Sequence, residues 1–188
     1  MNPLLSMFQS AGPEAFSKMS CQTAPYFSTI NPLISELETN HCVVQLPFAK
    51  EVTNHLGTVH AIAMCNAAEL AAGVMTTVSI PTGARWIPKG MTVEYLAKAK
   101  TDLTARASGE GVDWSSEGDK IVPVDVTDTD GKTVFMDRQV VDAGLPALHQ
   151  AVGCELPLFV AVGAVPLAVG IMPFVLEAHG DAVVGKGP

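Results

Sequence analysis

The stretch that decides the fold is 54-NHLGTVHAIAMCNAAELAAGVMTTV-78. It opens with polar residues, and after His60 its only charged residue is Glu69. Alanine, the residue with the highest helix propensity, recurs through it, so we expect a helix from Thr58 to about Met75. A surface helix carries a polar face along its length, whereas this one is apolar on nearly every side. The sequence therefore predicts a helix that is buried all round.

Two features of this helix need polar partners. Thr58 or Asn54 can accept hydrogen bonds from the free N–H groups of its first turn. Glu69 lies among apolar residues, where an ionised carboxylate is unfavourable unless it is paired or hydrogen-bonded. Glu69 is therefore the first candidate functional residue. The structural alternative is an ion pair with a buried arginine, such as Arg85 or Arg106.

The segments on either side of the helix predict an α+β fold. Residues 3–18 predict one or two short helices interrupted at Gly12-Pro13, and CVVQLPF at 42–48 predicts a first strand. Short turns, among them DTDG at 128–131, separate the later strand candidates. These candidates are Ala84–Pro88, Thr92–Ala99, Leu103–Ser108, Lys120–Thr127 and Thr133–Val141. The order predicts an antiparallel sheet wrapped around one helix.

We expect three parts in the chain: a helical segment 1–30, a sheet-and-helix domain 31–142 and an apolar C-terminal appendage 143–188. Residues 156–176 carry no charge, and their length suits a membrane span. Three prolines interrupt that run, however, and no basic flank sets an orientation, so membrane contact is the less favoured reading. There are two alternatives. The segment packs on the body of the protein or on a partner chain, or it is a non-native or recently acquired tail. We expect the appendage to supply no catalytic group.

Composition excludes several classes of function. The net charge of −8 and pI near 5.0 argue against nucleic-acid binding, which requires a basic surface. Cys21, Cys42, Cys65 and Cys154 form neither a CxxC pair nor a zinc pattern, so we expect reduced thiols in a cytoplasmic protein. The N-terminus lacks the basic and apolar regions of a signal peptide. Neither a metal nor a redox cofactor is expected.

The run Asn54-x-x-Gly57-x-x-His60, followed nine residues later by Glu69, resembles the hotdog-fold thioesterases. The similarity is greatest to the phenylacetate-pathway type and to a branch known only as a domain of unknown function. It covers about residues 30–140, including the run MTVEYLAKAKTDLTARA. The resemblance implies a hotdog fold, with a sheet wrapped around the long helix, a dimer as the basic unit and hydrolysis of an acyl-CoA thioester.

The chain departs from this pattern directly after the histidine. Many relatives have two glycines there, whereas this chain has Ala61 and Ile62. Glycines let a backbone approach a substrate closely. Their loss supports an alternative function, a non-catalytic hotdog module that binds acyl-CoA without turnover. A hydratase of the same fold is disfavoured, because those enzymes typically pair an acid and a histidine only a few residues apart.

Thioester hydrolysis assigns a role to each candidate residue. It requires stabilisation of an oxyanion and either an activated water or a direct nucleophile. The backbone amides near His60 and Ala61, at the positive end of the helix dipole, are expected to hold the oxyanion. Glu69 is expected to act as general base or nucleophile, with burial raising its pKa. Asn54, three residues before Gly57 in the same motif, is expected to donate to the thioester carbonyl, to hold the water, or only to brace its loop.

Two further residues, Asn66 and Lys89, complete the predicted site. Asn66 precedes Glu69 by three residues, so it is expected to share its helix face and to orient the carboxylate. Lys89 is a candidate for binding coenzyme A phosphates, with solvated surface charge as its alternative. Cys65 is interpreted as a packing residue. His60 has two alternatives to a chemical role, as a core residue or as a helix cap.

The spacing of His60 and Glu69 also predicts an oligomer. Nine residues at 100° and 1.5 Å each place them on opposite sides of the helix, roughly 13–14 Å apart along its axis. They cannot converge on one thioester from the same helix. Two chains related by a two-fold axis could instead build two equivalent sites, so we expect a homodimer or a dimer of dimers.

Overall fold

The computed structural model describes residues 2–144. The predicted 156–176 segment and nearly all of the predicted appendage therefore lie outside the described residues. The helices are α1 (Pro3–Ala11), α2 (Pro13–Thr23), η1 (Pro25–Ile30), η2 (Lys50–Val52) and α3 (Ala61–Ser79). The strands are β1 (Leu33–Glu38), β2 (His41–Leu46), β3 (Arg85–Tyr95), β4 (Leu103–Ser108), β5 (Gly118–Thr127) and β6 (Thr133–Gly144).

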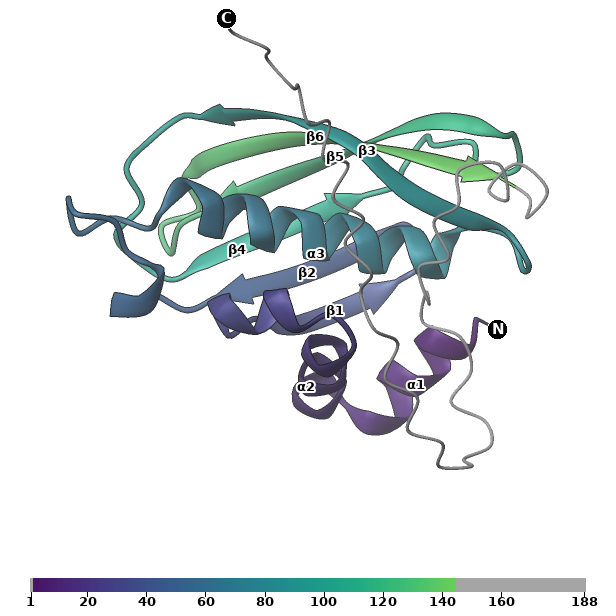
Figure 1. Cartoon of the computed structure of the whole chain (residues 1–188), viewed down its shortest axis with the longest axis horizontal. Helices are drawn as coiled ribbons and strands as arrows, with labels where there is room; N and C mark the ends of the chain where they lie inside the picture. The colour runs from purple at the N-terminus through teal and green to yellow at the C-terminus, as the bar shows by residue number, and fades with distance from the viewer. Residues whose placement is uncertain (1, 145–188) are drawn as a thin grey trace, which may run out of the picture.

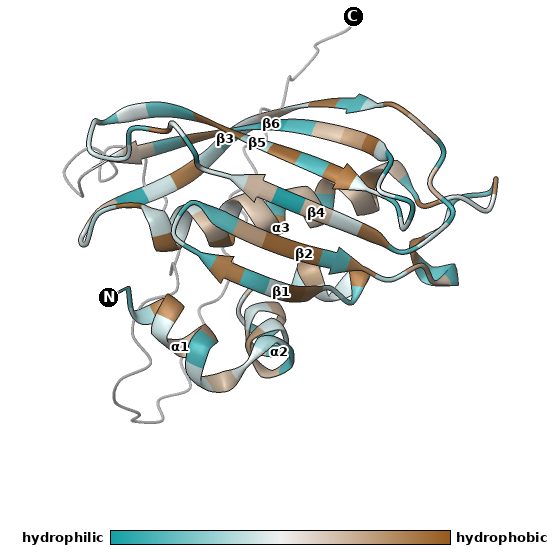
Figure 2. Cartoon of the chain, turned by 180° about the vertical axis from the view of Figure 1, so that it is seen from behind, coloured by the Kyte–Doolittle hydropathy of each residue, from teal (hydrophilic) through white to brown (hydrophobic). Residues whose placement is uncertain are grey.

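The six strands form one antiparallel sheet in the order β1-β2-β4-β5-β6-β3. α3 crosses one face of this sheet, in front of it in Figure 1 and behind it in Figure 2. Apolar side chains from all six strands pack against the helix, among them Val44, Ala105, Val124 and Phe135. The predicted α+β class, a sheet wrapped around one helix, is confirmed.

α3 begins later and ends later than the sequence predicted. It starts at Ala61 rather than Thr58, because the amide of Thr58 is held by Asn54 and that of Val59 donates to Ala99. His60 is the N-cap, in place of Thr58 or Asn54. The helix is long and apolar enough to cross a membrane, but most of it is buried inside the fold. It is therefore the core helix of the described domain.

Burial of α3 is incomplete on one side. Ile62 is exposed, and Cys65, Glu69 and Gly73 are partly exposed, so an open stripe follows the helix at intervals of three or four residues. This spacing is that of neighbours on one helix face. The prediction that the helix is buried all round is wrong along this stripe, which is the face that carries Glu69.

Several strands also differ from the prediction. The segment before the helix holds two strands, β1 and β2, joined by a tight turn in which Asn40 has φ 64°. A single strand, β3, spans the region where two strands, Ala84–Pro88 and Thr92–Ala99, were predicted. Its pairing shifts register between Pro88 and Gly90. β4 has the predicted bounds. β6 continues to Gly144, so it includes the first two residues of the predicted appendage.

Asn40 links the β1–β2 turn to the loop after β4. Its Oδ1 accepts a 2.7 Å hydrogen bond from Trp114 Nε1, and its carbonyl accepts one from the amide of Gly109. A Cβ atom at position 109 would lie 2.7 Å from Asn40 Oδ1 and 3.0 Å from Met75 Sδ. Gly109 is therefore required by a close approach of three segments.

Gly109→Ala is expected to destabilise the fold by about 1–3 kcal/mol, because the added methyl displaces Asn40 and breaks its bond to Trp114. The midpoint of urea unfolding measures this effect. Gly144→Ala is the matched control, since its added Cβ meets only Glu117 side-chain carbons at 3.7–3.9 Å. Equal midpoints for the two variants would contradict the expectation.

The two edges of the sheet differ in what lies beside them. At the β1 edge the hydroxyl of Ser17, on α2, accepts the amide of Ile34 at 2.8 Å, and α1 and α2 lie beside the strand (Figure 1). At the opposite edge β3 pairs with β6 alone, and no other strand or helix of residues 2–144 runs along its free side. In the described part of the chain, one edge is thus covered by helices and the other is open.

Candidate active site

The N-terminus of α3 leaves one amide without an acceptor. The amide of His60 donates to Val52 O at 2.8 Å, and that of Ile62 donates to His60 Nδ1 at 3.1 Å. The amides of Ala63 and Met64 donate to the carbonyl of His60. Of the amides from His60 to Met64, only that of Ala61 makes no hydrogen bond within the described residues. Of the two predicted oxyanion donors, the amides of His60 and Ala61, only the amide of Ala61 is therefore free to bind a ligand. His60 acts as a helix cap.

Asn54 and Gly57 shape the loop that leads into α3. Asn54 Oδ1 accepts from the amides of Leu56 and Thr58, and its Nδ2 donates to Thr58 Oγ1 at 2.8 Å. Gly57 has φ 68°, a left-handed conformation that glycine adopts readily, and its amide donates to Asn54 O. These contacts show Asn54 bracing the loop, with one N–H of its amide group left over.

Glu69 lies on the open stripe of α3, half-buried. Burial raises the pKa of its carboxyl above the usual range. The alternative of a buried arginine partner is wrong: Arg85 and Arg106 are exposed, and Arg106 donates to Thr127. No ion pair involves Glu69 in the part of the chain that the structure describes.

Two predicted substrate contacts lie elsewhere. Asn66 is buried and its Nδ2 donates to Thr29 Oγ1 on η1, at 3.2 Å, so its amide is directed to a different neighbour than Glu69. Lys89 sits at the β3 irregularity, where it pairs with Asp119 at 2.6 Å and approaches Asp142 at 3.8 Å. Both acids belong to the face of the sheet turned away from α3. The structure does not bring Asn66 or Lys89 together with Glu69.

The sequence interpretation missed two polar side chains on β6 that face α3. Asp137 is 2% exposed and Gln139 is 3% exposed. Neither carboxylate oxygen of Asp137 has a hydrogen-bond partner among the described residues, and Gln139 Oε1 also lacks a donor. Burial, with a smaller contribution from the charge of Glu69, raises the pKa of Asp137 to about 6. The nearby amides of Arg138 and Thr92 offset this shift only in part.

One contact fixes how α3 lies over β6. Cys65 Sγ is 3.3 Å from the Tyr95 hydroxyl, and Tyr95 is paired with Phe135 on β6. One helical turn past Cys65 is Glu69, about 6 Å further on. Two residues past Phe135 on the same face is Asp137, about 6.7 Å further on. Gly73 lies against the Trp86 ring and Trp86 is paired with Ala143, so α3 and β6 run in the same direction from this contact. Glu69 and Asp137 therefore lie at similar positions along the two elements, and the charge of Glu69 acts on Asp137.

The sequence held a signal for this polar pair. Asp137, Arg138 and Gln139 are three consecutive polar residues between the apolar pairs Phe135-Met136 and Val140-Val141. Successive side chains of a strand point to opposite faces, so either register buries at least one of them. The register observed buries Asp137 and Gln139 and exposes Arg138.

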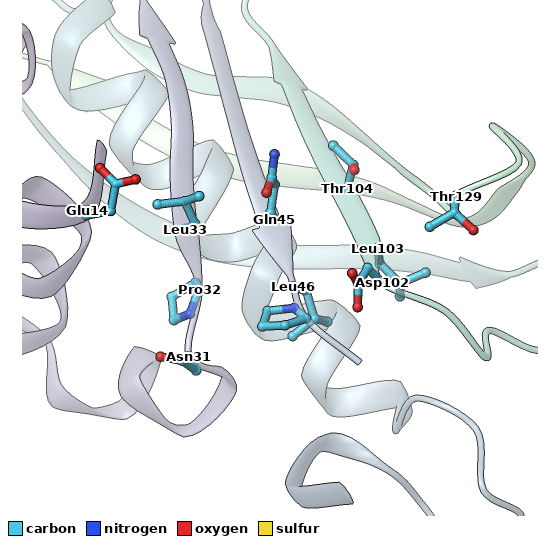
Figure 3. A pocket seen from close by; sticks show the side chains of 11 residues that line it. Glu14, Asn31, Pro32, Leu33, Gln45, Leu46, Asp102, Leu103, Thr104 and Thr129 are labelled. Atoms are coloured by element: carbon cyan, nitrogen blue, oxygen red, sulfur yellow. The ribbon is translucent and has the colours of Figure 1, made fainter. Parts of the chain in front are cut away.

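A surface groove of about 570 Å³ lies away from these residues. It is lined by Glu14, Asn31, Leu33, Gln45, Asp102 and neighbours, at the ends of β1, β2 and β4 (Figure 3). Among residues 2–144 its lining holds two carboxylates and no basic side chain, so it does not suit the phosphates of coenzyme A. It contains none of the candidate catalytic residues.

Comparisons with known proteins agree with this fold. The profile of a family described as "Domain of unknown function (DUF4442)" matches residues 12–141. A crystal structure of the structural-genomics protein APC5556 is 50% identical, with TM-score 0.70, over 76% of this chain and 97% of that one. No curated protein matches the chain.

More distant structures carry names that describe an activity. A thioesterase from Haemophilus influenzae is 14% identical, with TM-score 0.62, over 71% of this chain and 91% of that one. A probable thioesterase from Pseudomonas aeruginosa is 20% identical, with TM-score 0.60, over 66% of this chain and 90% of that one. At these identities the similarity shows the fold, which is the hotdog fold.

Proposed function

Because the chain belongs to the DUF4442 family and has the hotdog fold, we propose that it is an acyl-CoA thioesterase. The observation that supports this most is the pairing of two groups on α3: a helix-N-terminal amide without an acceptor and a half-buried carboxyl of raised pKa. Thioester hydrolysis requires one group of each kind. The thioesterase names of distant structural relatives point to the same substrate class.

In this proposal Ala61 N–H binds the thioester carbonyl oxygen, assisted by the positive end of the α3 dipole. Glu69 takes a proton from an attacking water, or attacks the carbonyl carbon itself. The loop braced by Asn54 holds the start of α3 in place, and His60 fixes the first turn by accepting the Ile62 amide.

The two groups come from different copies of the chain. Ala61 and Glu69 are eight residues apart, which is about 12 Å of helix, and the Ala61 N–H points away from the helix body. A second copy paired along the open β3 edge would bring the start of one α3 toward the middle of the other. Exposed apolar side chains at that end of the molecule, Ile62 at 53% and Tyr95 at 50%, would then be covered.

Sedimentation velocity is expected to show a dimer, or a multiple of it, at the concentrations at which the protein is active. Dilution that dissociates the dimer is expected to lower the specific activity in parallel with the dimer fraction. A monomer that retains full activity would refute the shared site.

The proposed activity is tested by incubating the protein with a panel of short, long and aromatic acyl-CoAs and measuring release of free thiol. Turnover of at least one member is expected. Tight binding of an acyl-CoA by calorimetry, with no hydrolysis over hours, would establish the non-catalytic binding module instead. If the protein neither binds nor hydrolyses any member of the panel, both proposed functions are wrong.

A further inference from the structure

Asp137 is a buried carboxylate that the proposed hydrolysis does not use. Both of its oxygens lack donors within residues 2–144, and its strand neighbours in register are Val93 on β3 and Val124 on β5. An apolar side chain would suit such surroundings, whereas an unpaired ionised carboxylate is strongly unfavourable there. A second polar side chain, Gln139, follows on the same face of β6, also nearly inaccessible and with an unpartnered oxygen.

Within residues 2–144, the elements packed around Asp137 place no basic side chain beside it. α3 contributes Glu69 and Cys65, and β3 contributes Tyr95, whose hydrogen bond to Cys65 raises the pKa of its phenol to about 12 and keeps it neutral. From β5 the facing side chains are valines. The nearest basic residue on the inner side of β5, Lys120, lies four residues beyond Val124, about 13 Å along the strand, and donates to Ser116.

We propose that Asp137 is a positioning residue for Glu69: its negative charge turns the Glu69 carboxylate away from the sheet, toward the substrate, and strengthens it as a base. This inference rests on the proposed thioesterase activity. Two neighbouring carboxylates without a cation between them repel, and a like charge nearby makes a carboxylate bind a proton more tightly. The buried Asp137 cannot move away, so the half-exposed Glu69 is the partner that reorients.

The pair also accounts for the proton released in the reaction. When Glu69 takes a proton from the attacking water, the pair changes from two negative charges to one. The proton can then form a hydrogen bond between the two carboxyl groups, until it passes to the departing thiolate. No further reactant is needed, and Asp137 touches neither the substrate nor the water.

The test compares wild-type protein with Asp137→Asn, which keeps the size of the side chain and removes its charge. Asp125→Asn, an exposed acid on β5, is the matched control. In the Asp137 variant the acid limb of the kcat/KM–pH profile is expected to move down by about one pH unit, because an amide donor now stabilises ionised Glu69. Because Glu69 is then a weaker base, kcat is expected to fall, with KM unchanged. An unshifted profile, or a loss confined to KM, would overturn the proposal.

A second measurement does not depend on activity. In ¹³C-carboxyl-labelled protein the Glu69 signal, assigned with Glu69→Gln, is expected to titrate at lower pH in Asp137→Asn than in wild type. Equal midpoints would refute the coupling even in an active enzyme. If no acyl-CoA is hydrolysed, the proposed function fails, and the same titration still decides whether Asp137 controls Glu69. A thermal melt by circular dichroism confirms that each variant is folded.

Discussion

Glu69→Gln is expected to lower kcat on the best acyl-CoA substrate at least about a hundredfold, the usual effect of removing a general base or a nucleophile. Glutamine has nearly the shape of glutamic acid, and Glu69 has no ion pair in the described structure that the change would break. KM and the unfolding temperature are therefore expected to change little. Steady-state kinetics and a thermal melt on the same preparation measure both effects.

The control for this variant is Glu110→Gln, an exposed acid in the turn after β4, which is expected to behave as wild type. Full activity in Glu69→Gln would eliminate the proposed chemistry. A single turnover of wild-type enzyme in ¹⁸O-labelled water separates the two roles of Glu69. Label in the Glu69 carboxyl group would establish the nucleophile route, because water that opens the acyl anhydride at the Glu69 carbonyl leaves its oxygen there, whereas the general-base route places the label only in the released acid.

Asp137→Asn is expected to make the protein more stable at pH 8, by up to about 3 kcal/mol. The carboxyl has a pKa of about 6 in the folded protein against an ordinary value of 3.8, and each pH unit of difference corresponds to about 1.36 kcal/mol. The folded state thus binds the proton more tightly than the unfolded state does. The stability of wild type is expected to fall as the pH rises from about 4 to about 6, and to stay lower above that.

Urea unfolding of the two proteins at pH 4 and at pH 8 measures this difference. At pH 4 both carry an uncharged side chain at position 137 in the folded state, so their free energies of unfolding are expected to be similar. At pH 8 only wild type holds a buried charge there. A variant that is less stable than wild type at pH 8 would show that Asp137 contributes a favourable contact, and the account of its burial would be wrong.

Much of the fold followed from residue patterns that act locally. The helix in 54–78 was predicted correctly because a long apolar run of residues with high helix propensity favours a buried helix. Its start was misplaced because Thr58 and Val59 are held by Asn54 and Ala99, contacts that no local pattern contains. The β1–β2 turn was missed for a similar reason: Asn40 adopts its left-handed conformation within contacts to Trp114 and Gly109.

The candidate site was only partly predictable. Glu69 stood out as a single charge in an apolar run, and the free amide at Ala61 follows from the general property of helix N-termini. Asp137 was missed because the sequence alone does not show which of the polar residues of a strand point inward. Its significance also depends on the way α3 lies over β6. Asn66 was assigned by spacing along the helix alone, whereas the nearby η1 supplies Thr29 as its actual partner.

The difference between the two sheet edges has a consequence for how far the protein can assemble. A strand with free amides and carbonyls is a template for further pairing, and a sheet open at both edges could polymerise into a fibre. Here any two copies joined along β3 would present β1 at both outer ends. Each of those ends is capped by the helix α2 of its own chain, with the Ser17 hydroxyl occupying the amide of Ile34. Growth of the sheet by edge pairing would therefore terminate at two copies, and a protection against aggregation is built into the N-terminal helices.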